Sequence, residues 1–376
     1  MRSMQWTGRV ESLESRETPS VAAGGLADNP MLPQPISPPI YGDPAFAVGA
    51  SAGQPPRVKT FDADGSLRQD FLAFEANFRG GVSVALADLN GDGVKDIIAA
   101  AGSGGGPRVR VFDGATTQDY FSGEPVRAVA QGILLDFFAF DAGFSGGVRV
   151  AVGDVTGDGT ADLVVAAGSG GSPHVKVFHG KTAALQQQIF AFDQAYSGGV
   201  NLAVSDLNAD GRADILAGTN GGTTATVAVV DGATTRTLRT FRPYGDFTGA
   251  VSVGVLAGSD IAADDFRRTA RDIVTAPGAG GAPHIKSFTV ASILNGSGTT
   301  EQPASQFLAY SQNFPGGARL ATADVDGDGY DDILTGAGPG GGPHVKMFDG
   351  RTNALQFQLF VPRVPDGDTS GVTLGS

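Results

Sequence analysis

The chain has 376 residues, and its 41% content of hydrophobic residues is enough to build one large core or two ordinary ones. It contains no cysteine, which excludes disulfides, cysteine-ligated zinc and thiol catalysis. Its formal net charge of −13 opposes binding to nucleic acids, and no apolar run is long enough for a membrane-spanning helix. The acidic excess instead favours solubility or an attraction for cations.

Residues 1–45 are predicted to form an export-type segment and a proline-rich linker. Prolines are frequent from Pro30 onward, and the segment lacks the apolar run of roughly 7–15 residues that a secretory signal peptide needs. The stretch Leu13-Glu-Ser-Arg-Glu-Thr-Pro19 resembles a segment near the start of many large exported bacterial surface proteins. This resemblance implies a location outside the cell or on a bacterial cell surface.

From residue 46 to residue 376 one pattern repeats, which predicts a second domain. In its first complete unit we expect strands at Val82–Ala87, Ile97–Ala101, Val109–Phe112 and Phe137–Phe140. Their apolar runs are nearly continuous, as is typical of small sheets covered on both faces. Four short strands of this kind predict one blade of a β-propeller. The equivalent starts of the units are Gly81, Gly147, Gly199, Ala250, Gly317 and Gly371.

The two ends of the repeat region complement each other. Strands expected at Phe46–Ala50, Arg57–Phe61 and Phe71–Phe74 lack a first strand, and Ser370–Gly375 matches the missing one. Pairing of these ends would close the ring and remove an open sheet edge. The sequence therefore predicts an all-β propeller of six four-stranded blades, closed by its N- and C-terminal segments.

An acidic loop follows the first strand in four of the units. It places oxygen ligands at positions 1, 3, 5 and 9, a glycine at position 6 and a backbone carbonyl at position 7, which is typical of calcium sites. We therefore expect about four Ca²⁺ ions, with weaker binding in the second and third loops; the alternative is a set of solvated turns. The predicted ligands are Asp88, Asn90, Asp92, Val94 and Asp96; Asp154, Thr156, Asp158, Thr160 and Asp162; Asp206, Asn208, Asp210, Arg212 and Asp214; and Asp324, Asp326, Asp328, Tyr330 and Asp332.

The fourth unit departs from this loop pattern. Ala257 takes the first ligand position, and Asp260, Asp264 and Asp265 fall out of register. We expect no calcium in this unit.

Two further marks accompany the loops and carry a family resemblance. Phe-x-Gly occurs as Phe78-Arg-Gly80, Phe144-Ser-Gly146, Phe247-Thr-Gly249 and Phe314-Pro-Gly316, and Gly281-Ala-Pro283 follows in the fourth unit. The units resemble FG-GAP or VCBS-type repeats of integrin α-subunit propellers and their bacterial relatives. The resemblance implies calcium on one face of the propeller and a ligand on the opposite face. It also implies seven blades as the alternative to six.

Basic residues recur at one position at the start of the third strand. A repeated packing or pairing role is expected, because equivalent positions stand around a ring and cannot meet at one metal ion. The alternative is a ligand-binding basic rim, completed by Lys59, Arg110, Lys176, Lys286 and Lys346, that takes acidic glycans. The position is occupied by Arg57, Arg108, His174, His284 and His344.

No acid, base or nucleophile stands outside the repeat pattern in a convincing catalytic arrangement. The irregular insertions 119–136 and 293–306 offer only Asp119 and Glu124 as a pair. We therefore expect a non-enzymatic, monomeric adhesion or interaction module that binds calcium and an extracellular glycan or protein. The alternative is a calcium-dependent polysaccharide-active enzyme or glycan-binding domain on the same scaffold.

Overall fold

The computed structural model describes residues 43–115, 132–258, 269–362 and 370–375. The chain divides into two compact units, residues 1–40 and residues 41–376. The predicted N-terminal segment therefore lies outside the described residues up to residue 42. In the second unit, every described element except the short helix α1 (Val290–Asn295) is a β-strand, so the all-β class is confirmed.

Four sheets contain four antiparallel strands each. In each sheet the strands follow one another in space as they do in the chain, apart from the sheet that combines both ends. The sheets are β24 (Val372–Gly375), β1 (Phe46–Ala50), β2 (Arg57–Phe61) and β3 (Leu67–Leu72); β4 (Val82–Ala87), β5 (Asp96–Ala101), β6 (Arg108–Phe112) and β7 (Ile133–Phe138); β8 (Val148–Gly153), β9 (Asp162–Ala167), β10 (His174–His179) and β11 (Leu185–Phe190); and β20 (Ala318–Ala323), β21 (Asp332–Ala337), β22 (His344–Phe348) and β23 (Leu355–Phe360).

The remaining strands form one sheet of eight, so only four blades stand as separate four-stranded sheets in the described chain. The prediction of six separate blades, with seven as the alternative, is wrong on this point. The eight strands are β12 (Val200–Ser205), β13 (Asp214–Thr224), β14 (Val227–Val230), β15 (Thr237–Phe241), β16 (Thr248–Gly258), β17 (Thr269–Pro277), β18 (His284–Thr289) and β19 (Ser305–Leu308).

A substitution in the glycine turn explains the joined sheet. Ala225 stands where Pro107 and its equivalents precede the third strand in other units, and its N–H donates to Phe247 O at 2.8 Å. Proline has no N–H and cannot make this bond. The strands β13 and β16 extend to 11 residues each and pair at Asn220 with Ala250 and at Thr224 with Thr248.

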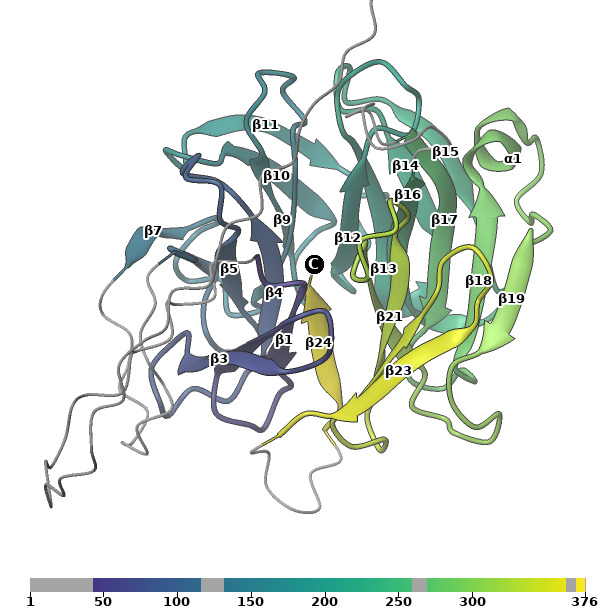
Figure 1. The fold of residues 1–376 in the computed structure, drawn as a ribbon. Helices are drawn as coiled ribbons and strands as arrows, with labels where there is room; N and C mark the ends of the chain where they lie inside the picture. The colour runs from purple at the N-terminus through teal and green to yellow at the C-terminus, as the bar shows by residue number, and fades with distance from the viewer. Residues whose placement is uncertain (1–42, 116–131, 259–268, 363–369, 376) are drawn as a thin grey trace, which may run out of the picture. The chain divides into compact units, whose positions relative to one another are not determined.

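The inner strands β4, β8, β12, β16, β20 and β24 contact one another in a closed ring (Figure 1). Neighbouring sets of strands pack face to face, and buried clusters such as Ile98 and Val109 against Val148 and Leu163 fill the space between them. Second strands such as β5 and β9 are buried along their whole length because a neighbouring sheet covers each face. This explains their continuous apolar runs.

The predicted closure of the ring is confirmed. Strand β24 pairs with β1 in antiparallel register, with Ala47 opposite Gly375 and Ala50 opposite Val372. The side chain of Thr373 also donates a 2.9 Å hydrogen bond to the carbonyl of Gly49. The first sheet is thus completed from both ends of the repeat region.

The fourth strands begin and end earlier than predicted. Strand β7 ends at Phe138, and its residues alternate in burial because the outer strand has one solvated face. Phe74 and Phe140 lie beyond these strands and pack edge-on against Phe78 and Phe144, at ring-centroid distances of 5.9 and 6.3 Å. The phenylalanine-rich runs therefore mark the following turn as much as the strand.

Candidate functional site

The first aspartate of each acidic loop holds the loop in shape through backbone hydrogen bonds. Asp88 Oδ1 accepts from Gly91 N at 2.7 Å, and its Oδ2 accepts from Gly93 N at 2.9 Å. Asp154 makes the same two bonds, at 2.7 and 2.8 Å, to the equivalent glycines. Gly93 has a φ of 84°, a left-handed conformation that favours glycine at position 6. The recurring Asp and Gly positions therefore give these loops the same backbone hydrogen bonds.

The aspartate at position 9 is the buried anchor of the loop. Asp96 and Asp214 are fully buried, and Oδ2 of each accepts from two backbone N–H groups at the start of its own loop, at 2.9 to 3.2 Å. Oδ1 of each accepts from a glycine N–H after the third strand, Gly114 at 3.1 Å and Gly232 at 2.9 Å. This residue therefore ties the loop to the blade.

Burial makes these anchors weaker acids than usual. It raises the pKa of Asp96 and Asp162 above the ordinary aspartate value, despite the hydrogen bonds they accept. Burial also raises the pKa of Asp214 to about 6 and that of Asp332 to about 6. The nearby loop carboxylates add repulsion in the same direction, for example Asp210 on Asp214. A cation in the loop would relieve both effects.

The oxygens of the loops fit a hard cation. In the last loop, carboxylate oxygens of Asp324, Asp326 and Asp328 all lie within 4.8 Å of one another. In the second loop, Thr156 Oγ1 and Asp162 Oδ1 are buried and have no hydrogen-bond partner among the described residues. Clustered carboxylates and unsatisfied buried oxygens suit a divalent ion such as Ca²⁺. The individual ligand assignments at positions 1, 3, 5, 7 and 9 stay predictions.

Comparison with known families identifies the repeat. The model of the FG-GAP-like repeat matches residues 154–217, and the model of the FG-GAP repeat matches residues 316–354. The chain contains FG-GAP repeats. No curated protein matches it. Among solved structures it is similar to the structure of the Dos1 propeller, with 15% identity, a TM-score of 0.42 and coverage of 81% of this chain. The match covers 64% of that chain, less than two thirds of its length.

In the fourth repeat unit, strand backbone stands where the other loops have their first predicted ligand. Ala257 lies within β16, its N–H donates to Asp331 Oδ2 at 2.7 Å, and its carbonyl accepts from Asp331 N at 2.9 Å. Asp260, Asp264 and Asp265 lie outside the described residues. Within the described part of this unit, a methyl group stands where the other loops have a carboxylate.

The basic position that begins each third strand makes packing and pairing contacts. His344 stacks on Phe360 at a centroid distance of 4.3 Å, and its Nε2 lies 3.1 Å from Gln358 Oε1. His174 stacks on Phe190 at 4.7 Å, and His284 stands opposite Leu308. Two further arginines form ion pairs: Arg57 with Asp70 at 2.6 Å, and Arg108 with Asp136 at 2.7 Å. Ligand binding by these residues stays a prediction.

The cations two residues further on, which the alternative interpretation placed in a basic rim, make contacts between repeat units. Each donates to a backbone carbonyl just after the fourth strand of the preceding repeat unit. Four of these cations, all except Lys59, also lie over the aromatic ring of the residue that follows the carbonyl, 4.7 to 5.4 Å from the ring centroid. These pairs are Arg110 with Ala73 O, Lys176 with Ala139 O, Lys286 with Pro243 O, and Lys346 with Ala309 O, while Lys59 donates to Pro362 O.

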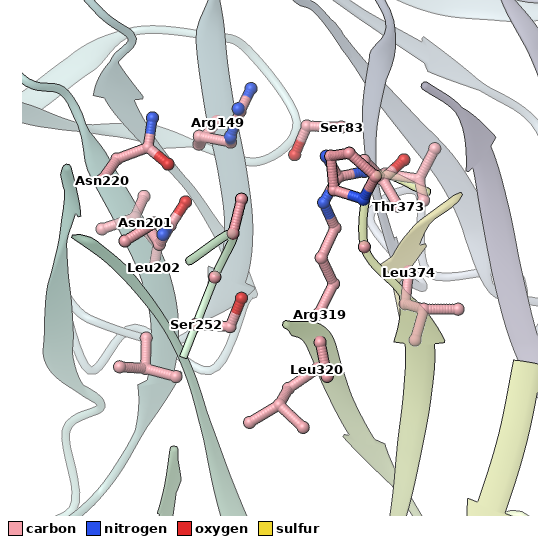
Figure 2. Close-up of a pocket in the computed structure, with 18 of the residues that line it drawn as sticks. Ser83, Arg149, Asn201, Leu202, Asn220, Ser252, Arg319, Leu320, Thr373 and Leu374 are labelled. Carbon is pink, nitrogen blue, oxygen red and sulfur yellow. The ribbon is translucent and has the colours of Figure 1, made fainter. Parts of the chain in front are cut away.

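A polar position on the inner strands was not among the predicted sites. One equivalent residue of each inner strand lines a central cavity of about 250 Å³ at the glycine-turn end of the ring; it is the second residue of every inner strand except the longer β16, where it is the fifth (Figure 2). In the sequence, each of these residues stands between two apolar ones. This pattern indicates a shared cavity only once the ring is known to bring the six inner strands together. The six residues are Ser83, Arg149, Asn201, Ser252, Arg319 and Thr373.

Proposed function

We propose that this FG-GAP repeat protein is a calcium-stabilised binding module that works outside the cell or on the cell surface. The observation that carries the proposal is the convergence of Asp324, Asp326 and Asp328 in a loop whose build is repeated three more times. Calcium would be held by loop carboxylates and carbonyls, and it would neutralise the repulsion among them. The extracellular setting, where calcium is abundant, suits sites of this weak type.

The eight-stranded sheet contains two sets of four strands, β12 to β15 and β16 to β19, and each set follows the strand order of the separate sheets. Six buried clusters fill the junctions between the six sets. The pairing of β13 with β16 joins these two sets of four strands at one rim.

Binding rather than catalysis is supported by where the perturbed carboxyls lie. The aspartates with raised pKa in the described chain are the position-9 anchors, and backbone N–H groups engage at least one oxygen of each. This is a structural arrangement repeated four times, whereas a catalytic pair would differ between units. A glycan or protein is the proposed ligand, and the proposed state is a monomer. No described helix is long and apolar enough to cross a membrane.

Calcium titration with calorimetry and thermal unfolding tests the proposal. Sites with a Kd on the order of 10⁻⁴–10⁻³ M would each add about 1–3 kcal/mol at 10 mM calcium. We expect the midpoint of unfolding to rise by on the order of 10 °C relative to protein with chelator. Asp328→Asn should reduce the number of bound ions by one and lower the midpoint measured with calcium.

The matched control is Asp246→Asn, an exposed aspartate outside the loops. It should bind the same number of ions as the wild-type protein. Equal midpoints of the wild-type protein with calcium and with chelator would overturn the calcium part of the proposal.

A further inference from the structure

The central cavity holds two arginines and no acidic partner for them. Arg149 is the second residue of β8, and Arg319 is the second residue of β20. Both line the same cavity, together with the hydroxyl or amide groups of the other four inner strands (Figure 2). No aspartate or glutamate is found among the described residues that line it.

The hydrogen-bond donors of the two guanidinium groups are largely unused. Arg319 donates to Ser51 Oγ at 2.9 Å and to Val372 O at 3.0 Å, and both acceptors are neutral. The side chain of Arg149 makes no hydrogen bond or ion pair with any described residue. Each guanidinium carries five N–H donors in a fixed planar fork, which suits the oxygens of a carboxylate, phosphate or sulfate.

The two positive charges also act on each other. Burial in the cavity lowers the pKa of Arg149, and burial together with the charge of Arg149 lowers the pKa of Arg319 to about 10. The chain has 39 acidic residues and only 26 lysines and arginines, so a shortage of acidic residues does not explain why Arg149 and Arg319 have no carboxylate beside them in the cavity. An arrangement of two like charges without a counter-charge is completed by an anion from solution.

We propose that the glycine-turn end of the central cavity is a binding site for one small oxyanion or carboxylate, held between Arg149 and Arg319. The cavity volume of about 250 Å³ is below the range of roughly 300–1,000 Å³ that holds drug-sized ligands, so the bound group is small. It is either a free inorganic anion or the acidic group of a sugar residue. The site is separate from the calcium loops and does not depend on the calcium proposal.

Calorimetric titration with sodium sulfate tests this site, with sodium chloride at matched ionic strength as the reference. Sulfate is chosen because its charge is fixed and it is compatible with millimolar calcium. We expect one sulfate per chain, and at least a tenfold loss of affinity in Arg149→Gln and in Arg319→Gln. The control is Arg236→Gln, which changes an exposed arginine outside the cavity and should leave sulfate affinity unchanged.

Two further measurements keep the test independent of folding defects. Arg149→Lys keeps the charge but loses the planar fork, so it should bind sulfate more weakly than wild type while retaining the thermal midpoint. In anion-free buffer, Arg149→Gln should raise the midpoint, because it removes a like charge next to Arg319. Sulfate affinity that is unchanged in both glutamine variants, or lowered equally in Arg236→Gln, overturns the proposal.

Titration with glucuronate, compared with neutral glucose, separates the two sources of the anion. Tighter binding of glucuronate than of sulfate, lost in both glutamine variants, identifies an acidic sugar. The reverse order identifies an inorganic oxyanion, and no binding of either probe overturns the site. Repeating the sulfate titration after calcium removal should give the same affinity, so failure of the calcium proposal would leave this result intact.

Discussion

At the residue scale, the position-9 aspartate shows how one side chain serves two states of the loop. Its carboxylate accepts backbone N–H groups from the loop, as Asp332 does from Val325 N at 3.0 Å. Burial at the same time makes its negative charge costly. The calcium-free loop therefore favours a protonated anchor more than an unfolded chain does, whereas a bound cation would favour the ionised anchor.

This anchor predicts the pH dependence of stability in the calcium-free protein. The pKa of Asp214 and that of Asp332 rise from 3.8 to about 6 on folding, so the folded state binds more protons between these values. Their stabilising contribution is complete below about pH 4 and is lost as the pH rises through about 6. We expect a loss on the order of 2 kcal/mol per carboxyl, measured by denaturant unfolding after calcium is removed by dialysis.

The comparison variants for this prediction are Asp332→Asn, which should flatten the slope, and Asp246→Asn, which should keep it. Saturating calcium should reverse the slope, because protons compete with the ion for the same carboxylates. An identical slope in Asp332→Asn and wild type would contradict the assignment.

The cations between units give a second prediction at this scale. Lys286 and Lys346 each donate a 2.9 Å bond to the preceding unit and lie over a tyrosine ring. Replacing either by Met keeps the apolar stem but leaves the carbonyl of Pro243 or Ala309 without its donor. We expect a loss of about 1–3 kcal/mol in the free energy of unfolding. Lys181→Met, at an exposed lysine, should change it by less than about 0.5 kcal/mol.

The residue scale also shows what sequence reasoning could and could not reach. The register of the acidic loops was readable, because Asp and Gly recur at fixed spacing. The contacts of Lys176 and Lys346 with the preceding unit could not be predicted. A lysine in a strand with alternating polarity is expected to face solvent unless the position of the neighbouring unit is known. Arg149 and Arg319 were missed for the same reason, since only ring closure brings their strands together.

At the element scale, the short strand β24 completes the sheet that contains β1. Its Val372 is buried in the cluster between the last unit and the first. Sequence predicted this pairing because the terminal segments complement each other, whereas the joined sheet around Ala225 was not predicted. Replacement of one proline by alanine does not change the hydrophobic periodicity of the sequence. The alanine nevertheless supplies an additional N–H, which changes how the two sets of strands connect.

Deleting residues 371–376 tests the importance of this strand. The loss removes the backbone bonds of β24 to β1 and leaves the edge of β1 open. We expect the thermal midpoint to fall by roughly 10 °C or more, and the deleted protein to associate at high concentration. Replacing Thr373 alone by Val should cost much less, since the backbone pairing remains. An unchanged midpoint in the deleted protein would contradict the closure.

At the whole-molecule scale, the core is divided among the junctions between sheets, and no single central core exists in the described chain. Each junction joins only adjacent sets of strands, so one repeat unit already contains the pattern of its own packing. The fold class could therefore be predicted from the repeat and its buried strands. The number of separate sheets did not follow, because it depends on local hydrogen bonds at the rim. The central cavity also did not follow, because it is formed by residues that lie far apart in the sequence.

The pairing of β24 with β1 also constrains how the protein can be completed on the ribosome. The side chain of Thr373 bonds to Gly49 across 324 residues of sequence, so the first sheet cannot gain its inner strand until residues 372–375 have emerged. Sheets in the middle can form earlier from contiguous segments. A translation product that stops before residue 370 would therefore expose a ready strand edge, which makes it a natural substrate for chaperones and proteases.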